Sequence, residues 1–202
     1  MEASLGDAAF RAAVERFVQP LVAPGRVNAL AQLLLKLTAP GVPDVYQGCE
    51  LWDLSLVDPD NRRPVDYALR RRLLADAERA TPEEAMARAD EGLPKLWLLR
   101  QALHLRRRAP AAFGAGEGGR YIPLAAEGPR AGHVVAFCRG AGVIAVAPRL
   151  VLTLAATGWG DTRLTLPAGR WANVLGAGDV FGGEVRLDAL LRRFPVALLS
   201  AA

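Results

Sequence analysis

The sequence contains few of the residues on which metal sites and disulfide frameworks depend. Its 202 residues include two histidines and two cysteines. Cys49 and Cys138 are far apart in the chain and have no metal-ligand spacing, so they predict two free thiols, with a single disulfide as the alternative. We expect neither a metal nor a cofactor.

Long apolar segments are also missing. No run of 18 apolar residues is present, and Met1 is followed by an acidic amphipathic stretch instead of the basic and apolar regions of a signal peptide. We therefore expect a cytoplasmic protein without membrane contacts. The hydrophobic fraction of 51% is high enough for a sizeable core.

Lysine is scarce, because Lys36 and Lys95 are the only lysines among the 25 basic residues. The sequence pI is about 9.6, but the formal net charge is only +4. Its arginines form short clusters within predicted helices or at strand ends, and no basic stripe interleaved with aromatics is found. This pattern favours solvated faces with local ion pairs over a nucleic-acid partner.

The first half of the chain has helical periodicity. Apolar residues recur at helical spacing over residues 7–18 and 26–38, and Pro20, Pro24 and Gly25 predict a break between these helices. A short apolar run follows at residues 42–46 and predicts a buried strand. Further helices are expected at residues 68–80, from the capping sequence at Thr81, and at residues 93–108.

The period changes to two after residue 113, and glycine becomes frequent. This pattern is typical of short antiparallel strands and predicts a β-sandwich. This change of pattern predicts a domain boundary near residue 110, between a mainly helical unit at 1–110 and a β-sandwich at 111–202. The expected strands are 121–124, 133–138, 143–147, 161–166, 170–174, 184–187 and 195–199.

The helical half cannot make a complete α/β sheet with only one strand. A lone strand leaves its backbone donors and acceptors without partners. The fold class is therefore an α+β fragment, in which residues 1–110 look like the end of a larger unit.

The longest irregular stretch lies between residues 37 and 67. Loops near 20 residues long are usually either functional or disordered, and the apolar content here argues against disorder. We interpret the stretch as an ordered polar loop at the mouth of a site. Its polar and aromatic members are Gln47, Glu50, Trp52, Asp53, Asp58, Asp60, Asn61, Arg62 and Arg63.

Residues 40–67, PGVPDVYQGCELWDLSLVDPDNRRPVDY, closely resemble the last barrel strand and following loop of maltooligosyl trehalose synthases. These enzymes are members of glycoside hydrolase family 13, the α-amylase family. NALAQLLLKLTAP, GWGDTRLTLPAG and RFPVALL fit the same family. The resemblance implies the C-terminal end of a (β/α)8 barrel, with its last helices and its eighth strand at residues 42–46, followed by an antiparallel β-sandwich domain.

The resemblance also implies an activity: an isomerase of the intramolecular transferase class, which converts the reducing-end α-1,4 linkage of a maltooligosaccharide into an α,α-1,1 trehalose linkage. Its catalytic carboxylates belong to strands four, five and seven, which this chain lacks, so we expect the chain to be inactive alone. Asp58 and Arg62 match glucose-contacting positions of the family. Candidate supporting residues are Tyr46, Gln47, Trp52, Asn61 and Arg63.

Each assignment has an alternative. Asp58 and Arg62 would otherwise form an internal salt bridge, Trp52 is favoured as loop core over sugar platform, and Glu50 and Asp53 are favoured as turn caps or arginine partners. The whole chain would otherwise be an α-glucan-binding or structural accessory module, or part of another family-13 glucosyl transferase. The expected partners are a maltooligosaccharide and the missing barrel portion, and the uncovered barrel surface would favour self-association.

Overall fold

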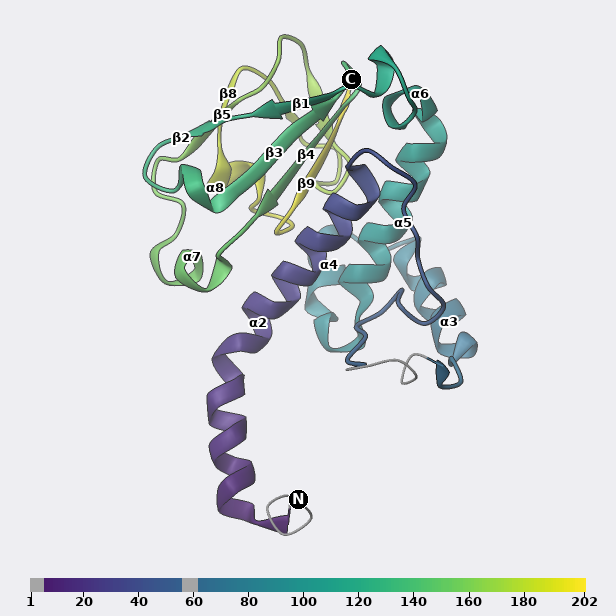
Figure 1. Ribbon diagram of the computed structural model, residues 1–202, viewed down its shortest axis with the longest axis vertical. Coiled ribbons are helices and arrows are strands. Elements are labelled where there is room, and N and C mark those ends of the chain that lie inside the picture. The colour runs from purple at the N-terminus through teal and green to yellow at the C-terminus, as the bar shows by residue number, and fades with distance from the viewer. Residues whose placement is uncertain (1–5, 56–61) are drawn as a thin grey trace.

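The computed structural model describes residues 6–55 and 62–202 and combines a group of helices with two antiparallel sheets (Figure 1). The longest helix, α2, packs with its C-terminal half between the six-stranded sheet and helix α5. The helices of the first half are α2 (Ala8–Thr38), α3 (Tyr67–Ala77), α4 (Pro82–Ala87), α5 (Leu93–Arg108) and α6 (Pro110–Phe113).

Helix α2 corrects the prediction of two separate helices. It continues through Pro20 and Pro24, and Figure 1 shows its axis changing direction about midway. A proline inside a helix removes one hydrogen bond and bends the axis without always ending the helix. Pro20 is exposed, so the carbonyl that loses its partner can be hydrated.

Residues 42–46 correct the prediction of a buried strand. They form no strand in this chain, and Val42 is 97% exposed. A strand exists only when a neighbour supplies hydrogen bonds, and every strand pairing found in the described residues lies beyond residue 120.

The helices that follow the loop agree closely with the sequence pattern. Helix α5 has the predicted bounds, and α3 covers most of the predicted 68–80. Thr81 forms a capping box with Glu84 at the start of α4, as the sequence predicts. A 3-10 turn, η2 (Ala89–Glu91), joins α4 to α5 through Gly92, whose φ of 80° is in the left-handed region.

The second half forms two antiparallel sheets, as predicted. The six-stranded sheet has the order β1-β3-β4-β9-β6-β7, and the three-stranded sheet has the order β2-β5-β8. The predicted hairpin is β3 paired with β4, in a register that places Phe137 opposite Ala145. The strands are β1 (Tyr121–Leu124), β2 (Ala126–Glu127), β3 (Val134–Arg139), β4 (Val143–Pro148), β5 (Arg163–Thr165), β6 (Trp171–Asn173), β7 (Val180–Phe181), β8 (Glu184–Arg186) and β9 (Ala197–Ala201).

Strand β4 is buried on both faces, because a separate core lies on each side of the six-stranded sheet. Ala145 faces the helices in a core shared with Leu34 and Leu98. Ile144 faces the three-stranded sheet in a second core shared with Leu164. The first core thus contains residues from both predicted domains, and the division at residue 110 stays a prediction.

Two arginines hold the C-terminal end of α2. Arg106 donates from Nη1 to the carbonyl of Leu37 at 2.6 Å, and Arg139 donates from Nη1 to the carbonyl of Thr38 at 2.6 Å. Both guanidinium groups lie over the ring of Phe113, with their Cζ atoms 4.6 and 6.0 Å from its centroid. The last carbonyls of a helix have no partner within the helix and carry partial negative charge, so these contacts satisfy and stabilise the helix end.

Arg139 is the most deeply buried of these groups, at 1% exposed. It also donates from Nε to the carbonyl of Gly119 at 2.9 Å. Burial lowers the pKa of both Arg106 and Arg139, but an arginine stays charged at neutral pH. The buried charge is therefore balanced by backbone carbonyls.

No helix within residues 6–55 and 62–202 is both long and apolar enough to span a bilayer.

We expect Arg139→Met to lower the free energy of unfolding by about 2 kcal/mol or more, because two buried carbonyls lose their donor. Arg139→Lys should not restore the loss, since an ammonium lacks the planar fork that reaches both carbonyls. Urea unfolding followed by circular dichroism measures the change.

Arg163→Met is the matched control. Arg163 pairs with Glu184 at 2.8 Å, and both side chains are about half exposed, so this variant should lose less than about 1 kcal/mol. Equal losses from Arg139→Met and Arg163→Met would contradict the role assigned to Arg139.

Candidate functional site

The loop that follows α2 is fixed to the helices by two side chains. Lys95 of α5 donates from Nζ to the carbonyl of Leu51 at 2.7 Å. The indole Nε1 of Trp52 donates to the carbonyl of Ala89 at 2.6 Å. Leu51 itself is 7% exposed and belongs to the helix–sheet core. This part of the loop is therefore ordered, as the sequence predicts.

The two ends of the loop are also joined to each other. Arg70 of α3 forms an ion pair with Glu50 at 2.9 Å and donates to the carbonyl of Gly48 at 2.6 Å. The hydroxyl of Tyr67 donates to Oε1 of Gln47 at 3.3 Å. The pairing of Glu50 with an arginine confirms the role that the sequence favours for this carboxylate.

The sequence-predicted site residues occupy different environments. Tyr46 is 44% exposed, and Gln47 is exposed beside Tyr67. Trp52 is partly buried against the core, and its N–H is already bonded, in agreement with the loop-core interpretation. Arg62 and Arg63 lie on the surface, and each takes part in an interaction.

Asp58 and Asn61 lie outside the described residues, and so does Asp60. Their predicted roles stay predictions. Sugar contact by the remaining candidates also stays a prediction.

Cys49 and Asp53 form a local pair. The thiol of Cys49 donates to Oδ2 of Asp53 at 3.2 Å, while the backbone N–H of Ser55 donates to Oδ1 at 2.9 Å. Hydrogen bonds from Ser55 and Cys49 lower the pKa of Asp53 to about 2. Burial, followed by the bond and the charge of Asp53, raises the pKa of Cys49. The raised pKa favours the protonated form of the Cys49 thiol, in keeping with a structural role.

Sequence reasoning missed the residues that hold the loop. Lys95, Tyr67 and Arg70 lie on helices whose sequence pattern shows only an amphipathic or arginine-rich face. Their partners are 20 to 44 residues away in the chain, so local spacing contains no signal for these contacts. Among residues 6–55 and 62–202, no group of three or more potential ligands is placed to hold a metal ion.

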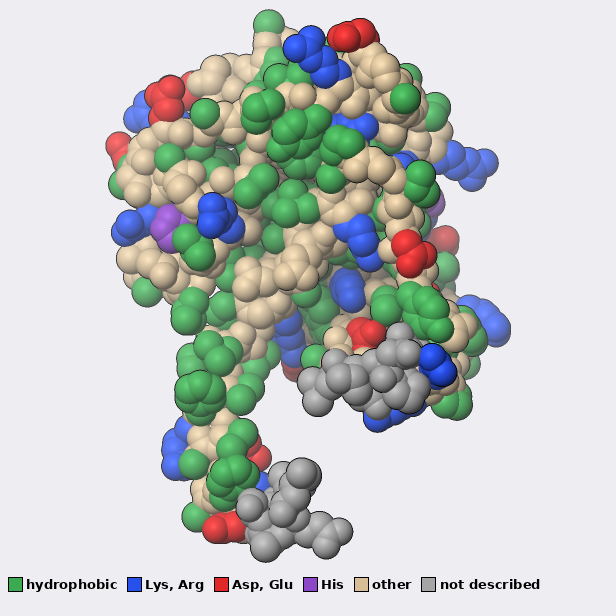
Figure 2. All heavy atoms as spheres, in the orientation of Figure 1, with side chains coloured by type: hydrophobic (Ala, Val, Ile, Leu, Met, Phe, Trp, Pro, Cys, Tyr) green, Lys and Arg blue, Asp and Glu red, His purple; other side chains and the backbone are tan. Residues whose placement is uncertain are grey.

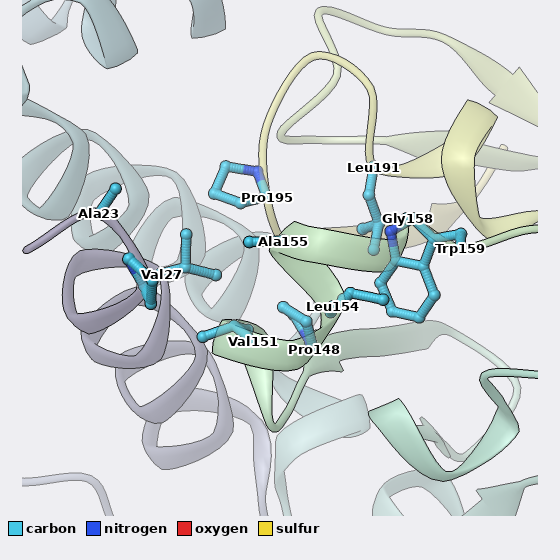
Figure 3. Close-up of a pocket in the computed structure, with 11 residues that line it drawn as sticks. Ala23, Val27, Pro148, Val151, Leu154, Ala155, Gly158, Trp159, Leu191 and Pro195 are labelled. Carbon is cyan, nitrogen blue, oxygen red and sulfur yellow. The ribbon is translucent and has the colours of Figure 1, made fainter. Parts of the chain in front are cut away.

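A separate apolar pocket lies between α2 and the sandwich (Figure 3). Its volume is about 290 Å³, and its walls include Val27 of α2, Leu154 of α7 (Val151–Thr157), Trp159 and Pro195. A sugar site needs several convergent polar groups, which this wall of aliphatic and aromatic side chains does not offer. The polar loop is therefore the better candidate site.

Comparison with known proteins finds relatives over most of the chain. No family model matches the chain. A Mycobacterium tuberculosis protein assigned by name to the maltooligosyl trehalose synthases is 46% identical over 172 residues, which are 85% of this chain and 20% of that protein.

Solved structures agree with this match. The maltooligosyltrehalose synthase from Arthrobacter ramosus superimposes with a TM-score of 0.87 and 41% identity, over all of this chain and 25% of that protein. A second structure of a maltooligosyl trehalose synthase, at 24% identity and a TM-score of 0.76, shows the shared fold alone.

These findings define the class of the chain. It is a mixed α/β fragment with antiparallel sheets that matches the C-terminal part of a larger enzyme. More specifically, the chain is a homologue of the C-terminal portion of maltooligosyl trehalose synthases. It spans about a fifth to a quarter of the length of these relatives.

We expect Asp53→Asn to lower the pKa of Cys49, because the change removes both a negative charge and a strong hydrogen-bond acceptor. The rate of carbamidomethylation by iodoacetamide at pH 8 should then rise several-fold, since the thiolate is the reacting form. Site-resolved mass spectrometry separates Cys49 from the buried Cys138.

Asp44→Asn is the control, because Asp44 is an exposed carboxylate in the same segment. It should leave the rate unchanged. An equal rate for the wild-type protein and Asp53→Asn would mean that Asp53 does not control the thiol.

Proposed function

We propose that this chain is the C-terminal portion of a maltooligosyl trehalose synthase. The whole enzyme would convert the reducing-end α-1,4 linkage of a maltooligosaccharide into an α,α-1,1 linkage, as an intramolecular transferase. The 46% identity to the Mycobacterium tuberculosis relative over 85% of the chain is the observation that carries the proposal. Agreement of the fold with the Arthrobacter ramosus structure supports it.

Residues 1–110 would complete a (β/α)8 barrel of glycoside hydrolase family 13. In that barrel, residues 42–46 would be the eighth strand and the preceding helix the seventh barrel helix. The exposure of Val42 supports this placement. The segment contains apolar residues and forms no strand pairing with the described residues, so its backbone can pair with a neighbouring strand of the barrel. The loop after it would lie at the C-terminal face of the barrel, where active sites of this fold are found.

The chain would supply a glucan-binding wall and not the catalyst. A retaining mechanism needs two carboxyl groups about 5 Å apart, one of them free to attack the sugar. The loop carboxylates Glu50 and Asp53 are occupied by Arg70 and by Ser55 with Cys49. We therefore expect no activity from the chain alone.

Arg62 is the residue to which we assign sugar contact, together with Asp58. An arginine fork and a carboxylate make charge-assisted hydrogen bonds to neighbouring sugar hydroxyls. Tyr46, exposed at the start of the loop, would offer an aromatic face to a pyranose ring.

A chimeric enzyme tests the proposal. This chain would replace its counterpart in the Arthrobacter ramosus enzyme, and conversion of maltopentaose to non-reducing product would be measured. We expect activity in the chimera and none in the isolated chain. Arg62→Ala should lower kcat/KM roughly 10- to 100-fold, the equivalent of one charge-assisted hydrogen bond.

Arg71→Ala, at an exposed arginine of α3, is the control and should leave kcat/KM unchanged. A different product linkage would assign the chain to another family-13 transferase. Calorimetric binding of maltopentaose to the isolated chain, without activity in the chimera, would indicate a glucan-binding module.

The N-terminal half of α2, residues 8–23, forms an exposed arm that we propose as the contact surface for the rest of the enzyme. Figure 2 shows hydrophobic side chains along this arm. Phe17 is 73% exposed, and Phe10, Val14 and Leu21 are each at least 40% exposed at helical spacing. Apolar stripes of this kind are normally covered by a partner. Without that partner, the chain would self-associate through the same stripe.

We expect Phe17→Glu to abolish co-purification of this chain with the remaining portion of the Arthrobacter ramosus enzyme. The stability of the isolated chain should change by less than about 0.5 kcal/mol, because Phe17 packs on little of its own fold. Light scattering of the isolated chain should show self-association that Phe17→Glu removes.

Gln19→Glu makes the same change of charge at an exposed position two residues away and should preserve the complex. Retention of the complex by Phe17→Glu would contradict the assignment of the arm.

A further inference from the structure

Arg70 is placed to connect the beginning and the end of the polar loop. Its Nη2 donates to the carbonyl of Gly48 at 2.6 Å and its Nε to Glu50 at 2.9 Å, both in the first part of the loop. Its Nη1 donates to the carbonyl of Asp66 at 3.1 Å, at the end of the loop. Each nitrogen of one planar group thus has a separate acceptor, and the side chain is only 18% exposed.

Other contacts reinforce this junction, which we call the loop neck (residues 47–50 and 65–70). Tyr67 donates to Gln47 across it. Gly48 has a φ of 90°, and a Cβ added there would lie 3.2 Å from Cγ2 of Val65. The two ends of the loop are therefore in direct contact at a point where glycine is required.

The neck restricts the described residues that adjoin it on either side. Leu51 and Trp52 are already fixed to the helices by Lys95 and Ala89, so the chain leaves the neck in one defined direction. Arg62 lies four residues before Asp66 in the sequence. Holding both ends reduces the conformational entropy that ligand binding would otherwise have to remove.

We infer that Arg70 is a positioning residue of the glucan site. This inference rests on the proposed function. Arg70 does not touch the sugar. It fixes the loop neck, and the neck fixes the place from which Arg62 reaches the hydroxyls of a glucosyl unit.

Arginine is needed for this role because its guanidinium has donors in a fixed plane. Lysine provides a single ammonium on a flexible stem and cannot reach Gly48, Glu50 and Asp66 together. The neighbouring Arg71 has the same charge but is exposed, so it provides a matched comparison.

Amide hydrogen exchange on the isolated chain tests the neck independently of activity. Arg70→Met should raise exchange about tenfold or more at Cys49 and Tyr67, because opening of the neck breaks the hydrogen bonds from their amides to the carbonyls of Tyr46 and Val65. Arg71→Met should leave these rates unchanged, and Arg70→Lys should resemble Arg70→Met. Unchanged exchange in Arg70→Met would overturn the inference, whatever the chimera does.

Kinetics of the Arthrobacter ramosus chimera then test the consequence. Arg70→Met should raise KM for maltopentaose about tenfold while kcat changes less, because positioning of a binding group affects substrate affinity first. Arg71→Met should leave both constants unchanged. Thermal unfolding of the chimera shows whether either variant has lost its fold.

The double variant Arg62→Ala with Arg70→Met distinguishes positioning from a general structural effect. If Arg70 acts through Arg62, the kcat/KM of the double variant should be no lower than that of Arg62→Ala alone. If instead the losses in kcat/KM of the two single variants multiply in the double variant, the inference is wrong. An inactive wild-type chimera would count against the proposed function instead, and the exchange experiment would still decide the role of Arg70.

Discussion

The capture of the C-terminal end of α2 by Arg106 and Arg139 is the interaction on which the rest of the structure depends. It joins α2, α5 and β3 at one point, over the ring of Phe113. Since Thr38 and Arg139 are 101 residues apart, the contact connects the helices to the sheet. The direction of α2 decides which of its side chains enter the core, and where the polar loop begins.

The helices and the six-stranded sheet share one hydrophobic core, so the stability of each depends on the other. Strand β4 contributes to a core on each of its faces. A change at Ala145 therefore affects the packing against the helices, and a change at Ile144 affects the packing against the three-stranded sheet. Because these two cores stabilise the helices and the sheets, the polar loop does not need regular secondary structure of its own. Its supports, Lys95 and Arg70, project from helices that are already fixed by the core, and they hold Gly48, Glu50 and Leu51 in place.

The sequence predicted what depends on neighbouring residues. The bounds of α5, the capping box at Thr81 and the β3–β4 hairpin follow from local periodicity, capping chemistry and turn residues, and all three are confirmed. The predicted break in α2 is wrong, because proline bends a helix that packing still continues. The predicted strand at residues 42–46 is not formed in this chain, because a strand needs a partner. The contacts of Arg70 and Arg139 were missed, since they join segments far apart in the chain. The sugar-contacting roles depend on family resemblance, which local physics alone does not supply.

The loop neck also has an evolutionary consequence. Its closing contacts involve side chains of Glu50, Tyr67 and Arg70 and the backbone of Gly48 and Asp66, and none of them comes from the segment that the neck encloses. Leu51 and Trp52, just beyond the neck, pack in or against the core, whereas Asp53, Leu54 and Ser55 are exposed. Substitutions at these three exposed positions change the surface of the loop and leave the packing of the core intact, so sequence variation is tolerated there more readily than at the neck.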